Sequence, residues 1–188
     1  DPDPAYAPLR GLIKGKNIIA IHVESLENMV VNRNFYGQEI TPNINRLLKN
    51  SIYFNNIYEQ VKDGNSSDAE LMVNASVYPI SEGSAFLRFA ENSYVTLPKL
   101  LKEEGYTTVA IHGDDRAFWN RDQVYPLLGY DKFIDEEQFD DKRSCGMGII
   151  DQSLFNQTIT EISRINQPFF MSVITVTSHI PFTLDPDM

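Results

Sequence analysis

The stretch "NIIAIHV", Asn17–Val23, decides the fold that we expect from this sequence. It is a continuous apolar run of strand length, which is typical of a strand buried on both faces of a parallel sheet. Two similar runs follow, at Tyr106–His112 ("YTTVAIH") and at Pro168–Thr177 ("PFFMSVITVT"). Buried strands of this kind need helices to cover both faces of their sheet. We therefore expect an α/β fold with a largely parallel central sheet flanked by helices.

Helical patterns do separate these strands. One helix is predicted in "TPNINRLLKN", with Thr41 as its N-cap and Pro42 at its first position. Another begins at Thr96 and ends at Gly105. Further helices are expected in "DAELMVNAS", "NRDQVYPLLG" and "DQSLFNQTITEISRI", the last with Leu154, Ile159 and Ile162 on one face, and a short strand is expected in "SIYFNNIY".

Composition restricts the kind of protein. The 188 residues suffice for one domain with a substantial core. The formal charge of -10 argues against a nucleic-acid surface, which needs basic residues. A lone cysteine, Cys145, excludes an intrachain disulfide. No apolar run approaches the length of a membrane span.

The domain organisation that we expect has two parts. Residues 1–16 include "DPDPAYAPLRG" and have the composition of a linker. Residues 17–188 are expected to form one α/β unit that is part of something longer.

Polar side chains stand where the three predicted strands end. Glu24 follows the first strand, His112 ends the second and His179 follows the third. In parallel sheets, ligands bind beyond the carboxyl ends of the strands. Each residue alone could be an edge carboxylate or a satisfied buried histidine, but three at one edge indicate a site. His22 lies inside a strand and is expected in the core.

The segment "DGNSSDAE", residues 63–70, begins a predicted helix near Ser66 or Ser67. Serine is a common helix N-cap, which is the simpler interpretation. The other interpretation is a nucleophile at a helix N-terminus, where free N–H groups favour a phosphate. A serine hydroxyl needs a base or a metal to activate it, and a metal is the better candidate because no GxSxG elbow is present.

The segment "DDRAFWNRDQVY" holds Trp119, the only tryptophan, and Arg121. Arginine can bind a phosphate through two parallel hydrogen bonds, and tryptophan can pack against an alcohol or a lipid head. In isolation the segment could equally be a surface turn with an aromatic lid.

Taken together, the motifs "HVESLEN", "GNSSDAE", "GSAF", "HGDDRAFWNRDQVY", "GYDKF" and "TVTSHIPFTL" resemble the extracellular catalytic domain of lipoteichoic acid synthases. These enzymes belong to the alkaline phosphatase and sulfatase superfamily, and the resemblance runs from Asn17 to Leu184. It implies a membrane protein of a Gram-positive bacterium with this domain on the extracellular face of the cell membrane. Residues 1–16 would then be the linker from an upstream membrane region, and residues 17–188 the N-terminal part of a sulfatase-like catalytic domain whose C-terminal part is absent. It also implies a cell-wall transferase that uses Mn²⁺, with Mg²⁺ or Zn²⁺ as alternatives, to move glycerol phosphate from phosphatidylglycerol to a polyglycerolphosphate chain or a glycolipid acceptor.

The resemblance also implies roles for individual residues. Glu24 would be a metal ligand, and Ser66 would be both the catalytic nucleophile and a metal ligand. The positions that would bind the glycerol phosphate group are His112, Trp119, Arg121 and His179. Well-known members carry threonine where this chain has Ser66, and their remaining metal ligands, an Asp-His pair, lie downstream of Met188. We therefore expect weak metal binding and no turnover from these residues alone.

The expected reaction is a two-step transfer through a covalent serine intermediate. A sulfatase-like phosphodiesterase or a phosphoethanolamine transferase would keep the same nucleophile and metal with another donor or acceptor. A non-catalytic binding domain is the alternative from a different class, and it predicts that Ser66 can be replaced without loss of function.

Overall fold

A computed structural model of the chain describes residues 10–183, and its centre is a four-stranded parallel sheet. The strands lie in the order β1 (Ile18–His22), β8 (Phe169–Ile174), β4 (Thr107–His112) and β5 (Lys132–Ile134). All three neighbouring pairs are parallel. The α/β fold with a parallel central sheet is therefore confirmed, and the three apolar runs are its β1, β4 and β8. The expectation that the first run is buried on both faces is wrong, because β1 is the edge strand and its Ile19 and Ile21 are 45% and 51% exposed.

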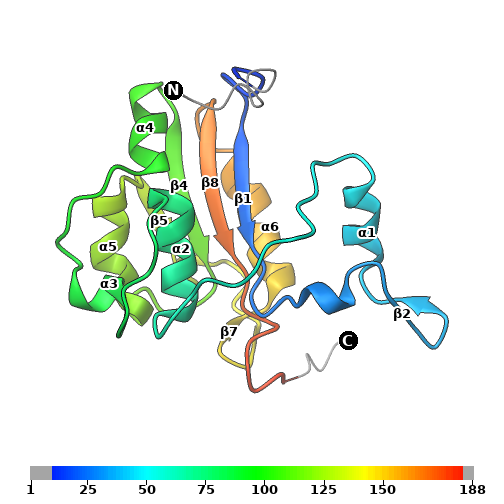
Figure 1. The fold of residues 1–188 in the computed structure, drawn as a ribbon. Helices are drawn as coiled ribbons and strands as arrows, with labels where there is room; N and C mark the ends of the chain where they lie inside the picture. The colour runs from blue at the N-terminus through cyan, green and yellow to red at the C-terminus, as the bar shows by residue number, and fades with distance from the viewer. Residues whose placement is uncertain (1–9, 184–188) are drawn as a thin grey trace.

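Helices cover both faces of this sheet, as Figure 1 shows. One face carries α2 (Asn65–Ala75), α3 (Ala85–Arg88), α4 (Leu97–Glu103) and α5 (Arg121–Leu128). The opposite face is covered by α6 (Asp151–Ile162). Two separate hydrophobic cores result, one on each side of the sheet.

Strand β8 shows why its sequence is continuously apolar. Phe170 and Ile174 pack in the core beneath α2, α3 and α5, whereas Met171 and Val173 pack in the core beneath α6. All four side chains are at most 2% exposed. Successive side chains of a strand point to opposite faces, so a strand buried on both faces needs apolar residues at every position.

The helix ends follow the sequence signals in part. At α4, the Thr96 hydroxyl accepts a hydrogen bond from the Lys99 N–H, and Gly105 follows the helix with a φ of 84°. In α6, the predicted apolar face is only partly correct, because Leu154 is fully buried but Ile159 is 66% exposed.

A small lobe lies beside β1 in Figure 1. It contains the 3-10 turn η2 (Asn28–Val30), the hairpin β2 (Asn34–Phe35) and β3 (Gln38–Glu39), and helix α1 (Pro42–Leu48). Helix α1 begins at Pro42 as predicted, although the Thr41 side chain makes no capping hydrogen bond.

The predicted short strand at residues 51–58 is wrong: the segment has no regular secondary structure. Its apolar side chains are exposed, including Ile52 at 69% and Ile57 at 75%. A strand needs a hydrogen-bonding neighbour, and within residues 10–183 strand β1 pairs only with β8. Local β propensity alone therefore did not produce a strand here.

The remaining elements are short. They are the 3-10 turns η3 (Phe118–Asn120) and η4 (Glu136–Gln138) and the hairpin of β6 (Ser144–Cys145) and β7 (Gly148–Ile149). A Cβ added to Gly148 would lie 2.3 Å from the Gly113 carbonyl oxygen, so the hairpin needs a glycine to approach the end of β4. Within the described residues, no helix has the length and apolar character needed to cross a membrane.

Candidate active site

The three strand ends meet in one narrow pocket. Glu24, His112 and His179 line it together with Ser66 at the start of α2 and Arg121 at the start of α5. The other lining residues are Asp114, Phe118, Met147 and Val176. The structure thus brings together five of the six site residues predicted from the sequence, and the sixth, Trp119, lies elsewhere.

Ser66 is placed to react rather than to cap the helix. The N-cap position of α2 is Gly64, so the interpretation of Ser66 or Ser67 as the N-cap is wrong. The Ser67 hydroxyl is buried and donates to the Gly64 carbonyl oxygen at 2.7 Å. The Ser66 hydroxyl points the other way and donates to Glu24 Oε2 at 2.9 Å. Of the two serines, Ser66 is therefore the one that faces the pocket.

Glu24 is held by the segment that follows β8. Its backbone N–H donates to the Thr175 hydroxyl at 2.9 Å, and the Thr175 N–H donates to the His22 carbonyl oxygen at 3.0 Å. His22, which we expected in the core, is only partly buried, and that burial lowers the pKa of its imidazole. The hydrogen bonds of Thr175 fix the backbone that carries Glu24 at the end of β1.

Glu24 and Ser66 could hold part of a metal site. Their oxygens already converge, and carboxylate and hydroxyl oxygens suit Mn²⁺ or Mg²⁺. Within residues 10–183, however, no group of three or more His, Cys, Asp and Glu residues could hold a metal ion. The donor set therefore fits a divalent cation in kind, and further ligands would have to complete it.

A buried ion pair stands behind the pocket. Glu70 and Arg121 are 2% and 1% exposed, and Arg121 Nη2 donates to Glu70 Oε1 at 2.7 Å while Arg121 Nε donates to the same oxygen at 3.2 Å. The Tyr125 hydroxyl donates to Glu70 Oε2 at 2.6 Å. Burial opposes the charge on Glu70, but Arg121 and the Tyr125 hydrogen bond hold the pKa of this carboxyl below its usual value.

This ion pair restricts what Arg121 can do. We expected its guanidinium to bind a phosphate through two parallel hydrogen bonds, but the edge formed by Nε and Nη2 is occupied by Glu70. Nη1 donates to the Phe118 carbonyl oxygen at 3.3 Å and has a second N–H to offer. Arg121 therefore brings a fixed positive charge to the pocket, and only the Nη1 side of its guanidinium can still donate a hydrogen bond to a ligand.

Glu70 is the important residue that the sequence analysis did not select. It lies four residues after Ser66 in the same helix, so both lie on one face of α2. That spacing was the available signal. Without a structure, a glutamate in a helix is usually interpreted as solvent-exposed.

His112 is neutral at physiological pH. Burial, reinforced by the charge of Arg121, lowers its pKa to about 4. Its Nδ1 lies 3.0 Å from the Ile174 carbonyl oxygen, which can only accept, so Nδ1 carries the proton. Nε2 is then an acceptor, 4.0 Å from the nearer Asp114 oxygen. His112 is suited to accept a hydrogen bond from a hydroxyl rather than to donate one to a phosphoryl oxygen.

The two remaining predicted residues differ in position. His179 lies in the loop after β8, lines the pocket, and has Nδ1 2.7 Å from the Ile180 carbonyl oxygen. Trp119 packs against the core beneath α2, α3 and α5 and does not line the pocket. Its neighbour Phe118 lines the pocket instead.

The pocket is nearly closed in this conformation. Its cavity volume of about 10 Å³ leaves room for about one water molecule. Phe118 and Met147 are 40% and 37% exposed, so both can move without opening the core.

Comparison with known proteins identifies the family. A model of the sulfatase family matches residues 16–188, nearly the whole chain. The chain belongs to the sulfatase family. Its likeness to lipoteichoic acid synthases is confirmed as well, since it is 42% identical over 181 residues to lipoteichoic acid synthase 1 of Bacillus subtilis strain 168. That alignment covers 93% of this chain but 28% of the relative.

Solved structures agree with this assignment. The lipoteichoic acid synthase structure from Listeria monocytogenes is similar with a TM-score of 0.88 and 33% identity over 94% of this chain. A phosphoglycerol transferase from Streptococcus pyogenes, solved with sn-glycerol-1-phosphate, has a TM-score of 0.71 and 25% identity over 93% of this chain. The sulfatase-family chain spans 44% and 48% of these two proteins, respectively.

Replacing Glu70 tests the buried ion pair. Glu70→Gln keeps the shape of the side chain but leaves the Arg121 charge unpaired, so we expect the free energy of unfolding to fall by about 3 kcal/mol. Urea denaturation followed by circular dichroism measures this change. As a matched control, Glu104→Gln removes an exposed carboxylate that pairs with Lys14 and should cost less than about 1 kcal/mol. Equal losses in the two variants would contradict the role given to Glu70.

The lowered pKa of His112 makes stability depend on pH. The unfolded chain binds a proton at this histidine near pH 6.5, whereas the folded chain binds it near pH 4, so stability is lost as pH falls through that range. We expect the wild type to lose about 3 kcal/mol more than His112→Asn between pH 6.5 and 4. Asparagine can keep the hydrogen bond to Ile174, so it isolates the titration. Parallel pH profiles of unfolding free energy would contradict this assignment.

Proposed function

We propose that this chain forms part of a phosphoglycerol transferase that moves glycerol phosphate from phosphatidylglycerol to a polyglycerolphosphate chain. The observation that carries the proposal is the hydrogen bond from the Ser66 hydroxyl to Glu24, beside the fixed charge of Arg121. The named activities of the relatives support it, because they are lipoteichoic acid synthases and a phosphoglycerol transferase.

Ser66 would be the nucleophile of the first step. Its oxygen forms a bond to the phosphorus of phosphatidylglycerol, and the bond from phosphorus to the diacylglycerol oxygen breaks. The hydroxyl proton leaves toward Glu24, which already accepts it in a hydrogen bond. In the second step, the oxygen of an acceptor hydroxyl forms a bond to the same phosphorus, and the bond from phosphorus to the Ser66 oxygen breaks. Glu24 returns its proton to Ser66, and the acceptor's proton passes to His179, which gave its own to the departing diacylglycerol oxygen.

Three other residues would bind the substrate. The Nη1 side of Arg121 is suited to a phosphoryl oxygen, and Nε2 of His112 is suited to accept from a glycerol hydroxyl. His179, in the loop after β8, would orient or protonate the departing oxygen of diacylglycerol. Trp119 would act indirectly, by supporting the turn that presents Phe118 to the pocket.

Glu24 and Ser66 would hold a divalent cation, with Mn²⁺ proposed first and Mg²⁺ or Zn²⁺ as alternatives. When bound, such an ion lowers the pKa of a hydroxyl and offsets charge on phosphoryl oxygens. Because two oxygen donors make a weak site, we propose that residues 10–183 bind it weakly and do not turn over alone. Tight stoichiometric Mn²⁺ binding by the 188-residue chain would contradict this division of ligands.

The proposed setting is the extracellular face of a bacterial membrane, where the donor lipid is present. The acceptor would be the growing glycerophosphate polymer or a glycolipid. A sulfatase-like phosphodiesterase or a phosphoethanolamine transferase would use the same Ser66 site on a different donor or acceptor, and a non-catalytic binding domain would not use Ser66 at all.

Intact mass spectrometry of the full-length protein tests the nucleophile. After incubation with Mn²⁺ and phosphatidylglycerol, we expect one added glycerophosphate, mapped by peptide analysis to Ser66. Ser66→Ala should give no adduct and lower release of diacylglycerol by about a thousandfold or more. Ser66→Thr retains a hydroxyl and serves as the matched control that should still form the adduct.

Three outcomes would contradict the proposal. An adduct formed only with another donor lipid would favour one of the other transferases. Steady release of glycerol phosphate to water, with no transfer to an acceptor, would favour a phosphodiesterase. Full function of Ser66→Ala would favour the binding domain.

A further inference from the structure

A second cavity lies in the lobe beside β1, away from Ser66. Its volume is about 260 Å³, far larger than that of the active-site pocket. We call it the lobe pocket, and its lining consists of Asn32, Asn34, Glu39, Pro42, Asn45, Arg46 and Lys49. Six of these seven side chains are polar or charged, so the cavity is suited to a charged, hydroxyl-bearing group and not to an apolar one.

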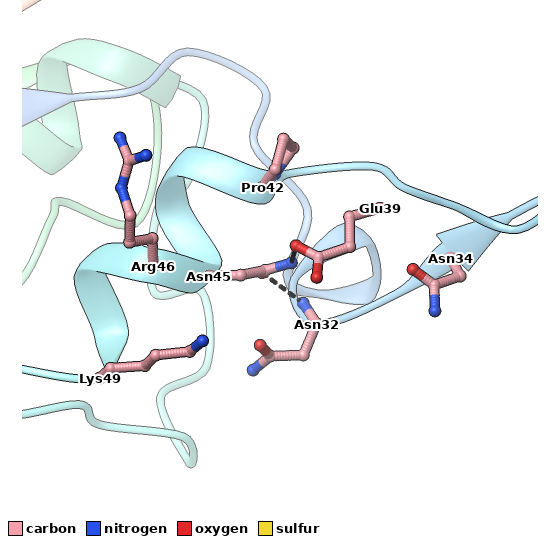
Figure 2. A pocket seen from close by; sticks show the side chains of 7 residues that line it. All are labelled: Asn32, Asn34, Glu39, Pro42, Asn45, Arg46 and Lys49. Carbon is pink, nitrogen blue, oxygen red and sulfur yellow. Dashed lines mark hydrogen bonds between the residues drawn. The ribbon is translucent and has the colours of Figure 1, made fainter.

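The base of the lobe pocket is built by Asn45, which is only 7% exposed. Its Oδ1 accepts from the Asn32 N–H at 2.8 Å, and its Nδ2 donates to Glu39 Oε2 at 3.1 Å. Figure 2 shows both contacts at the centre of the cavity. Asn45 therefore connects α1, the β2–β3 hairpin and the preceding loop, and the shape of the pocket is fixed before any ligand binds.

Other polar groups of the lining remain available. Among the described residues, no hydrogen bond or ion pair engages the side chains of Asn32, Asn34 or Lys49. Arg46 pairs only with the neutral Asn43, at 3.0 Å. These residues offer two positive charges and two carboxamides, a set that binds a phosphate and the hydroxyls beside it.

The charge of this lobe is opposite to that of the chain as a whole. Residues 32–49 contain three basic side chains and one acidic side chain, whereas the whole chain carries -10. The acidic one, Glu39, is already bonded to Asn45. A local positive charge on an acidic protein favours an anionic partner at this lobe.

Two aromatic side chains project next to the pocket, at the tip of the β2–β3 hairpin. Phe35 is 66% exposed and Tyr36 is 93% exposed, and their rings meet edge to face with centroids 4.5 Å apart. Figure 1 shows this hairpin as the part of the lobe farthest from the central sheet. Exposed aromatic rings beside basic residues are typical of surfaces that enter the headgroup region of a membrane.

We propose that the hairpin tip and the lobe pocket together form a docking surface for an anionic phospholipid membrane. Phe35 and Tyr36 enter the headgroup region, and the pocket receives the phosphate and hydroxyls of one anionic headgroup through Lys49 and the asparagines. The Arg46 guanidinium points away from the other lining side chains in Figure 2 and adds positive charge beside the pocket. This surface is separate from the Ser66 site, and the seven residues 25–31 connect Glu24 to Asn32. It would bring the Ser66 pocket to the membrane without taking part in the transfer reaction.

Vesicle flotation of the purified 188-residue chain tests this proposal. We expect binding to vesicles of phosphatidylcholine mixed with phosphatidylglycerol and little binding to phosphatidylcholine alone. Lys49→Gln and Arg46→Gln should each weaken binding about fivefold. Phe35→Ser with Tyr36→Ser should weaken it about tenfold. Lys142→Gln and Tyr78→Ser, which change an exposed lysine and a tyrosine that is 80% exposed outside the lobe, are matched controls that should bind as the wild type does.

Several results would overturn the proposal. Equal binding to both kinds of vesicle, or no binding to either, would do so. So would lobe variants that bind as well as the wild type, or control variants that lose as much binding as the lobe variants. Full competition by free sn-glycerol-1-phosphate, with no effect of the hairpin variants, would assign the pocket to a soluble ligand instead. Ser66→Ala should not change vesicle binding, so failure of this proposal is distinguishable from failure of the transfer reaction.

Discussion

The buried ion pair between Glu70 and Arg121 is the interaction on which the site depends. Two charges lie in the core with at most 2% exposure, which is tolerated only because they satisfy each other and Tyr125 supplies a further hydrogen bond. The pair joins α2 to α5, two helices that are far apart in sequence. Because α2 also carries Ser66, one contact fixes the separation between the proposed nucleophile and the positive charge that would face its substrate.

The parallel sheet supplies the other half of the arrangement. The carboxyl ends of β1, β4 and β8 lie at one edge, so Glu24, His112 and the loop with His179 reach the same pocket from three segments. Thr175, just after β8, holds the backbone of Glu24. The Ile174 carbonyl oxygen, at the end of β8, selects the tautomer of His112. Strand β8 thus determines both the position of the carboxylate and the chemistry of the imidazole.

The strands and the gathering of polar residues at one sheet edge could be predicted, because a continuous apolar pattern is local in sequence. Burial on both faces explains that pattern for β4 and β8 but not for the edge strand β1, whose Ile19 and Ile21 are exposed. The errors have non-local causes. Residues 51–58 have strand-like composition but no neighbouring strand among the described residues. Ser66 could be interpreted as a helix N-cap because its hydrogen bond to Glu24 joins residues 42 positions apart, and a local pattern cannot show such a contact. The pairing of Glu70 with Arg121, and the presence of Phe118 in the lining of the pocket, likewise depend on packing that no local pattern reports.

The stereochemical course at phosphorus is the most direct test of the proposed two-step transfer through Ser66. Each in-line displacement inverts the configuration, so two successive displacements restore it. A donor glycerophospholipid with a chiral phosphorothioate, given to the full-length enzyme with an acceptor, should yield a product with retained configuration, read by phosphorus NMR. Inversion would mean that the acceptor attacks the donor directly, and it would contradict the role assigned to Ser66.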